Sequence, residues 1–282
     1  MPRPVSVLLF IAISCHTAVA AVNKENDRTS SAAPISGARA ATPAELTLLN
    51  EALHKTAGDF YRWAYTEHRV MRDEKGRVKS DTLLRHDPSK PYEEQWTPLK
   101  IDGKEPSDRE KAKYRRRGEK SAPSNNPVME SGPEPDNRRR RALGELIDVM
   151  KSTITSETSS HFVYEVPLIK VGNERFPPEK FLVLARVKKE GRQLENVAVQ
   201  LRGSFRSKVL VKVKSGEGSL DFTVVDPKFP PTLTAIAGGA EASVLFVNIG
   251  GTMTLKRTQL KHVKPFDERF DVQIGTLKAI DF

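Results

Sequence analysis

The chain has 282 residues, a length that suits one large or two small domains, and a formal net charge of +10 from 46 Lys and Arg against 36 Asp and Glu. Its single cysteine, Cys15, excludes an internal disulfide framework. The positive charge favours anionic partners such as phospholipid headgroups, lipopolysaccharide or acidic protein surfaces.

Residues 1–20 are typical of a secretory signal peptide. Arg3 is followed by a short apolar run, and Ala18–Ala20 offer the small-x-small pattern of a cleavage site after Ala20. The apolar run is shorter than the roughly 20 residues that a membrane-spanning helix needs. A lipoprotein signal processed at Cys15 is the alternative, although Ala12 fits a lipidation motif poorly. A buried N-terminal strand is a third interpretation.

Cleavage after Ala20 would have three consequences. It would leave 262 residues (282 − 20) with a net charge near +9 (45 − 36), and it would remove the only cysteine. It would also place the protein in the periplasm, which argues against nucleic acid as a partner. A lipid anchor on Cys15 would instead tether the protein to a membrane.

The first predicted element after the signal is a helix. Residues 21–41 are rich in small and polar residues and are expected to form a flexible leader. Thr42 and Glu45 form a capping box around Pro43, and leucines recur at helical spacing up to Gly58. The sequence therefore predicts an amphipathic helix over 43–57.

The next segment predicts strands and a second helix. Residues 63–71 and 77–85 are expected to form a hairpin around a turn at 73–76, and 94–101 another strand before an Asp102-Gly103 turn. Ser107 and Glu110 form a second capping box that opens a basic helix through Arg117.

Residues 118–137 contain four prolines and almost no large apolar residue, and are expected to form a disordered linker. A helix is predicted from Arg138 through Met150. From 161 to 282 apolar and polar residues alternate, as at Phe270, Val272 and Ile274, which predicts antiparallel strands with one buried face. Glycines such as Gly216, Gly218 and Gly250-Gly251 are expected to separate these strands.

Familiar catalytic motifs are absent from the sequence. The six histidines show no i, i+4 pair, and no GxSxG, phosphate-binding loop or GxGxxG occurs, so nothing calls for a metal or a cofactor. The segment from Gly216 to Asp221 is better explained as a turn than as a phosphate loop. A hydrolytic site assembled from distant residues stays open.

Two groups of residues are candidates for binding. Leucines of the first helix and aromatic residues after it could line an apolar cavity, or could be ordinary core. These are Leu49, Leu53, Phe60, Trp63 and Tyr65. Basic residues on both sides of the linker could contact an anionic surface, or could be a solvated charge run. These are Arg115, Arg116, Arg117, Arg138, Arg139, Arg140 and Arg141.

The order of motifs is similar to that of a known family. The Trp63-Ala-Tyr-Thr-Glu segment, Asp87-Pro-Ser-Lys-Pro, the run from Glu94 to Ser107 and the closing Phe266-Asp-Glu-Arg-Phe resemble Gram-negative envelope proteins of the lipoprotein-sorting (LolA-like) and RseB-like type. The resemblance covers 43–282 and is strongest over 63–114. It implies an α+β chain, mainly antiparallel β, folded as a strongly curved half-open β-barrel with two or three covering helices.

On these grounds the chain is expected to be a non-enzymatic periplasmic protein, with 43–282 forming a single domain interrupted by the linker. The resemblance implies that it binds a lipid or a lipoprotein acyl chain in a concave apolar cavity, with helix 43–57 and the helix after Arg141 as lids. The alternatives are an envelope sensor or scaffold that binds another protein, and an exported hydrolase. The sequence does not indicate an oligomeric state.

Overall fold

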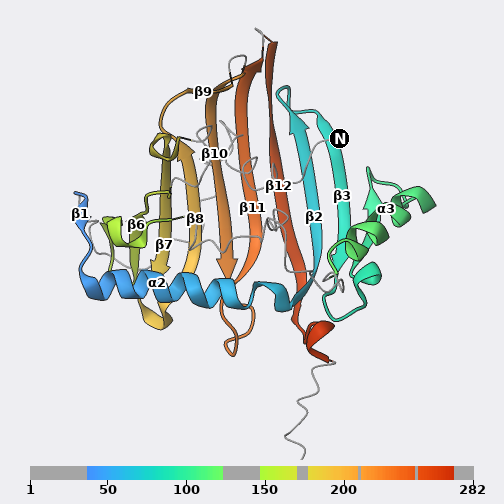
Figure 1. Cartoon of the computed structure of the whole chain (residues 1–282), viewed down its shortest axis with the longest axis horizontal. Helices are drawn as coiled ribbons and strands as arrows, with labels where there is room; N and C mark the ends of the chain where they lie inside the picture. The colour runs from blue at the N-terminus through green and yellow to red at the C-terminus, as the bar shows by residue number, and fades with distance from the viewer. Residues whose placement is uncertain (1–36, 123–146, 170–176, 209–210, 245–246, 270–282) are drawn as a thin grey trace, which may run out of the picture.

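The computed structural model describes residues 37–122, 147–169, 177–208, 211–244 and 247–269. They form one broad antiparallel sheet that carries two α-helices (Figure 1). The strands are β1 (Arg39–Ala40), β2 (Trp63–Asp73), β3 (Val78–His86), β4 (Trp96–Ile101), β5 (Thr153–Glu157), β6 (His161–Glu165), β7 (Phe181–Lys188), β8 (Gln193–Leu201), β9 (Phe205–Lys208), β10 (Val211–Thr223), β11 (Thr232–Val244) and β12 (Val247–His262).

The strand order is β1-β5-β6-β7-β8-β10-β11-β12-β2-β3-β4, and β9 pairs with β10 beside this path. The structure thus confirms an α+β chain that is mainly antiparallel β. The sheet is not closed into a barrel, because in the described part of the chain its edge strands β1 and β4 do not pair with each other. The expected barrel is therefore matched only in its open, antiparallel character.

Helix α2 (Pro43–Gly58) confirms the first predicted helix and lies across one end of the sheet (Figure 1). Its capping box is formed: the Glu45 N–H donates to Thr42 Oγ1 over 3.4 Å, and the Thr42 N–H donates to Glu45 Oε2 over 2.7 Å. The helix buries one stripe at helical spacing. This stripe consists of Leu49, Ala52, Leu53 and Thr56.

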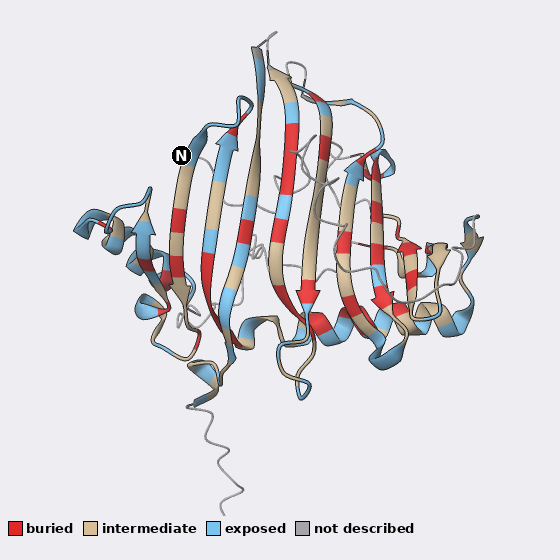
Figure 2. Cartoon of the chain, turned by 180° about the vertical axis from the view of Figure 1, so that it is seen from behind, coloured by how far each residue is buried: buried red, intermediate tan, exposed pale blue. Residues whose placement is uncertain are grey.

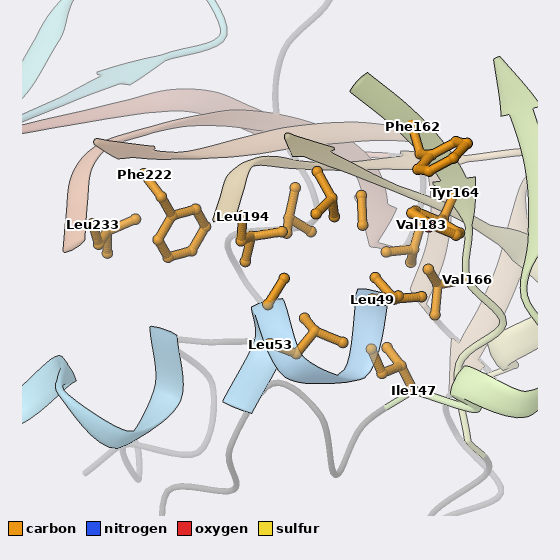
Figure 3. Packing of buried hydrophobic residues seen from close by; sticks show 14 of the residues in the cluster. Leu49, Leu53, Ile147, Phe162, Tyr164, Val166, Val183, Leu194, Phe222 and Leu233 are labelled. Atoms are coloured by element: carbon orange, nitrogen blue, oxygen red, sulfur yellow. The ribbon is translucent and has the colours of Figure 1, made fainter. Parts of the chain in front are cut away.

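The main apolar core lies between α2 and the sheet (Figure 3). Leu49 and Leu53 from the helix meet side chains from β5 to β8 and from β10 to β12. The Tyr164 hydroxyl in the same layer donates to the Glu45 carbonyl over 3.0 Å, which ties the helix to β6. We call the side of the sheet that bears this core the helix face, and the opposite side, seen in Figure 2, the outer face.

Strand register shows which other side chains belong to the helix face. Leu255 on β12 is a core residue and pairs with Arg69 on β2, so Arg69 points to the same side of the sheet. Glu67 and Arg257 are paired with each other and lie two residues from Arg69 and Leu255, so they also point to that side. Charged residues thus occupy the helix face at the β12–β2 end of the sheet.

Helix α3 (Asp108–Glu119) confirms the predicted basic helix and packs beside β4. Ser107 and Glu110 form its capping box, as expected. Gly118 allows α3 to pack closely against the backbone at Tyr92, because a Cβ at this position would lie 1.8 Å from the Tyr92 carbonyl oxygen. The helix continues through Gly118 and Glu119, into the segment predicted as linker.

Several sequence predictions need correction. Gly216 and Gly218 do not separate strands: they lie inside β10 and pair with Ala240 and Gly238 of β11, so the predicted turn from Gly216 to Asp221 is wrong. Gly250-Gly251 likewise lies inside β12. Gly251 is required there because its φ is +154° and a Cβ would lie 2.1 Å from the Arg72 carbonyl oxygen.

The helix predicted from Arg138 to Met150 is also wrong where it can be compared. Ile147 forms a β-bridge with Leu168, and Val149–Lys151 form a 3₁₀ turn. Residues 138–146 lie outside the described residues, as does the strand predicted around Val272. Arg39–Ala40, which were expected in the flexible leader, form β1 against β5.

Other predictions hold. The β2–β3 hairpin turns at 73–76, where the Gly76 N–H donates to the Asp73 carbonyl over 2.9 Å. The strand expected from 94 begins at Trp96, after a 3₁₀ turn at Tyr92–Glu94. Within the described ranges, no helix has the length and apolar content to span a membrane.

Candidate functional site

The residues predicted to line an apolar cavity are mostly enclosed by the chain itself. Leu49 and Leu53 are 0% and 3% exposed in the core under α2, and Trp63 and Tyr65 are 2% and 5% exposed. Phe60 is partly buried against the same core. An acyl chain would therefore reach Leu49 and Leu53 only after α2 moves away from the sheet.

The structure separates these five residues into groups. Leu49 and Leu53 contact aliphatic side chains, whereas Trp63 donates its indole N–H to Asp59 Oδ2 over 3.0 Å. Phe60 and Tyr65 lie beneath the Arg257 guanidinium, whose carbon is 5.3 Å and 4.0 Å from their ring centroids. The aromatic residues after α2 thus belong as much to a charged cluster as to the apolar core.

The predicted cationic residues are only partly described. Arg115, Arg116 and Arg117 are exposed on α3, and the Arg117 guanidinium lies over the Trp96 ring, 4.1 Å from its centroid. Arg138 to Arg141 fall outside the described residues. Whether the two basic runs form one patch therefore stays a prediction.

A group of charged and aromatic side chains occupies the helix face between β12, β2, β3 and α3, and we call it the arginine cluster. It consists of Tyr65, Glu67, Arg69, His86, Trp96, Tyr114, Arg117 and Arg257. Glu67 is its one carboxylate, with a side chain only 2% exposed. Arg69 Nη2 donates to Glu67 Oε1 over 2.6 Å, and Arg257 Nε lies 3.5 Å from Glu67 Oε2.

Glu67 joins the two arginines of β2 and β12 in this cluster. The Arg257 side chain is 8% exposed and that of Arg69 30% exposed, and both depend on the Glu67 carboxylate. Among the described residues, the Nε atoms of Arg69 and Arg257 are buried without a hydrogen bond. Both guanidiniums are nevertheless paired with Glu67, through Arg69 Nη2 at 2.6 Å and through Arg257 Nε at 3.5 Å.

The neighbouring titratable groups respond to these charges. Burial lowers the pKa of His86 to about 4, helped by the positive charges of Arg257 and Arg117, so its imidazole is neutral near pH 7. Burial also raises the pKa of the Tyr114 hydroxyl, while Arg117 and Arg69 act in the opposite direction. Arg117 thus lowers the pKa of both His86 on β3 and Tyr114 on α3, against the effect of burial in the case of Tyr114.

A cleft of about 370 Å³ lies toward the opposite edge of the sheet, where β6 ends and β7 begins. Apolar side chains make up much of its wall, and charged ones stand beside them. The lining residues are Glu165, Val166, Pro167, Leu168, Pro178, Glu179, Phe181 and Arg202. Phe181 also belongs to a second apolar cluster with Leu201 and Val213. This volume lies within the range of about 300–1,000 Å³ that small-molecule pockets occupy.

A serine and a histidine also come together on the outer face. Ser160 Oγ lies 2.8 Å from His161 Nδ1, and His161 Nε2 lies 2.9 Å from Glu195 Oε2. The carboxylate is close but out of line with the ring N–H, since Nε2 makes no hydrogen bond within the described residues. Glu195 also lies 3.5 Å from Arg186 Nε. Activation of a serine needs an aligned base and acid, so we interpret this group as a surface ion network.

Sequence reasoning missed the arginine cluster, although one signal for it was present. Tyr65, Glu67 and Arg69 alternate along β2, which places them on one face of the sheet. Arg257 lies 188 residues after Arg69 in the chain (257 − 69). The pairing of β12 with β2 brings the two side chains together. In the part of the chain that the structure describes, no three metal-ligating side chains form a group.

Comparisons of this chain with models of protein families, with curated proteins and with solved structures found no match. The resemblance to LolA-like and RseB-like proteins therefore stays a prediction.

Proposed function

We propose that this chain is a non-enzymatic protein of the bacterial envelope that binds one acyl chain of a lipid or lipoprotein on the helix face of its sheet. The observation that carries the proposal is the cleft beside Val166, Leu168 and Phe181. An apolar wall of this size suits a hydrocarbon chain, because removal of apolar surface from water drives such binding.

The surroundings of the cleft support this assignment. The second apolar cluster continues its wall along β7, β8 and β10, so a chain longer than the cleft finds further apolar surface there. Arg202 and Glu165 form an ion pair among the lining residues, which gives the site a polar boundary. The proposal includes the predicted signal peptide, a periplasmic location and a curved, half-open sheet of the LolA and RseB type.

The proposal differs from the sequence-based one in the residues that face the ligand. Leu49, Leu53 and Trp63 stabilise the fold, whereas Phe181 and Leu168 contact the acyl chain. Helix α2 is then a fixed cover of the core, and no movement of α2 is needed for binding in the cleft.

Native mass spectrometry of the full chain, purified from the periplasm of a Gram-negative host and followed by lipid extraction, tests the proposal. We expect one acyl lipid per chain. Phe181→Arg is expected to abolish this occupancy by placing a charge in the apolar wall. Val225→Arg places the same charge at a position that is 42% exposed, after β10 and outside the cleft. Thermal unfolding of both variants separates lost binding from lost folding, because Phe181 itself is only 5% exposed.

A lipid-free wild-type protein that also fails to bind a fluorescent fatty acid would contradict the proposal. That outcome would favour the alternative of an envelope sensor or scaffold that binds another protein. Equal occupancy in Phe181→Arg and wild type would show that the lipid binds outside the cleft.

A further inference from the structure

We propose that the exposed side of α3 is a docking surface for a membrane that carries anionic lipid, and that one row of basic residues along this helix makes the contact. The row consists of Arg109, Lys113, Arg116 and Lys120, and we call it the basic stripe. The proposal goes beyond acyl-chain binding and does not depend on it. Helix α3 contacts β4 and the 3₁₀ turn at Tyr92–Glu94, whereas the cleft lies where β6 ends and β7 begins.

Helical spacing brings the four side chains of the basic stripe together. They follow one another at intervals of four, three and four residues, which at about 100° per residue places them within about 60° of each other round the helix. The stripe extends along about 16 Å of the helix, from its first turn to the C-cap at Lys120. Successive Cβ atoms are then about 5–6 Å apart, so the four charges can face one anionic surface together.

The packing of α3 sets the direction in which the stripe points. Gly118 is buried against the backbone at Tyr92, where a Cβ would lie 1.8 Å from the carbonyl oxygen. The four basic residues lie about 140–180° from Gly118 round the helix, so they point away from the turn on which α3 is docked. All four are exposed, and Figure 1 shows α3 beside the edge of the sheet.

The charges of the stripe are available for an external partner. Within the described ranges, none of its four side chains forms an ion pair or a hydrogen bond. Arg117 is not part of the stripe, because its guanidinium lies over the Trp96 ring. Of the three arginines 115–117 that the sequence suggested as one group, the stripe thus contains only Arg116. Like charges three and four residues apart on a helix repel each other, and an anionic surface would relieve this repulsion.

The acidic residues of α3 lie off the stripe. Asp108 is 3.8 Å from Lys111, which stands on another side of the helix. Glu110 belongs to the capping box, where hydrogen bonds from Ser107 lower its pKa, with the charge of the stripe as a smaller cause. Glu119 is exposed about 60° from the nearest basic residue of the stripe. The stripe therefore presents one sign of charge to a partner that approaches α3 from outside.

The chemistry of the stripe favours a membrane over other anionic partners. A cluster of about four to eight Lys and Arg residues on a helix is typical of segments that bind anionic lipid headgroups. Single-stranded nucleic acid is usually bound by basic residues together with aromatic side chains on which bases stack, and the stripe contains no aromatic residue. The predicted signal peptide also favours an encounter with membranes rather than with nucleic acid.

Co-sedimentation of the full chain with lipid vesicles tests this surface. We expect the wild type to bind vesicles that contain phosphatidylglycerol, to ignore vesicles of phosphatidylcholine alone, and to be released by added salt. Lys113→Gln combined with Arg116→Gln should weaken the binding about 30-fold, because each basic residue near an anionic bilayer contributes about fivefold. Both positions are exposed, so the Tm of this double variant should equal that of wild type.

The matched control lies on the same helix. Lys111→Gln combined with Arg115→Gln removes the same charge from exposed positions that are at least about 100° from the stripe. This double variant should weaken vesicle binding by no more than about threefold, because its side chains do not face the bilayer. Equal losses in the two double variants would overturn the proposal, since net charge and not the stripe would then determine binding.

Two further outcomes would overturn the proposal. The first is a folded wild-type chain that shows no salt-sensitive binding to phosphatidylglycerol vesicles. The second is a chain that binds duplex DNA or polyglutamate more tightly than these vesicles, with the larger loss in the stripe variant, because the partner would then be a polyanion and not a membrane.

The test also separates this surface from the acyl-binding cleft. Phe181→Arg should bind phosphatidylglycerol vesicles as the wild type does. The Lys113→Gln and Arg116→Gln double variant should keep its affinity for a fluorescent fatty acid. Failure of the acyl-binding proposal and failure of this one therefore give different results.

Discussion

The helix face of the sheet is packed differently at its two ends, with apolar side chains under α2 and charged side chains beside α3. Under α2, aliphatic and aromatic side chains fill the space, and Leu49, Val187 and Leu194 are completely buried. Beside α3, the equivalent layer holds Glu67, Arg69 and Arg257, whose burial is costly. The two parts of the helix face are therefore stabilised by different interactions, apolar packing under α2 and ion pairs beside α3. The following predictions test this contrast, from the largest expected effect to the smallest.

Leu49→Ala should strongly destabilise the α2 end. The side chain is 0% exposed, and deletion of a buried leucine costs about 3–5 kcal/mol through lost transfer free energy and the cavity left behind. Urea unfolding measures the change. Asn50→Ala, at an exposed position one residue later, should change the free energy of unfolding by less than about 0.5 kcal/mol. Similar effects for both variants would show that α2 does not cover the core.

The α3 end should make stability depend on pH through His86. The folded pKa of about 4 lies below the ordinary value of 6.5, so between these values the unfolded chain binds the proton more readily. The stability contribution is fully present above pH 6.5 and is lost as the pH falls from 6.5 to about 4. A shift of this size corresponds to roughly 3 kcal/mol.

The His86 prediction is checked by urea unfolding at several pH values in wild type and in His86→Gln. The variant should lose most of the slope between pH 6.5 and 4. Below this window the lowered pKa values of Asp73, Asp87 and Glu45 add their own losses in both proteins. An unchanged slope in His86→Gln would mean that the imidazole is not buried among Arg257 and Arg117.

Gly118→Ala compares how the two helices dock. A Cβ at Gly118 would lie 1.8 Å from the Tyr92 carbonyl oxygen, so α3 must shift, at a cost of about 1–3 kcal/mol. Gly58→Ala, at the end of α2, meets nothing within 4 Å and should be neutral or slightly stabilising. Thermal unfolding separates the two variants. Equal Tm values for the two variants would show that α3 does not dock closely against Tyr92.

Local chemistry explains which elements could be predicted. The capping boxes at Thr42 and Ser107 fix both helix starts within a few residues, and the alternation in β2 and β7 fixes which side chains share a face. Predictions failed where a glycine is compatible both with a turn and with the interior of a strand. Gly216 and Gly218 are suited to a turn, yet they lie inside β10 opposite Ala240 and Gly238.

The candidate sites depended on contacts that are distant in sequence. Phe60 and Tyr65 were recognised as candidates for binding, but their partner Arg257 could not be, because no local pattern links it to β2. The cleft brings Val166 together with Arg202 through the β6–β7–β8 pairing. Register and strand order therefore decided both sites.

The sequence by itself determined the antiparallel β character, the position of α2 and α3 and the buried stripe of Leu49 and Leu53, because caps and periodicity act within a few residues. Tertiary structure decided that the sheet stays open and that α2 fills one half of its face with apolar side chains. It also brought Arg257 onto Glu67 and Arg69, since a charge balance between β2 and β12 exists only once those strands are paired.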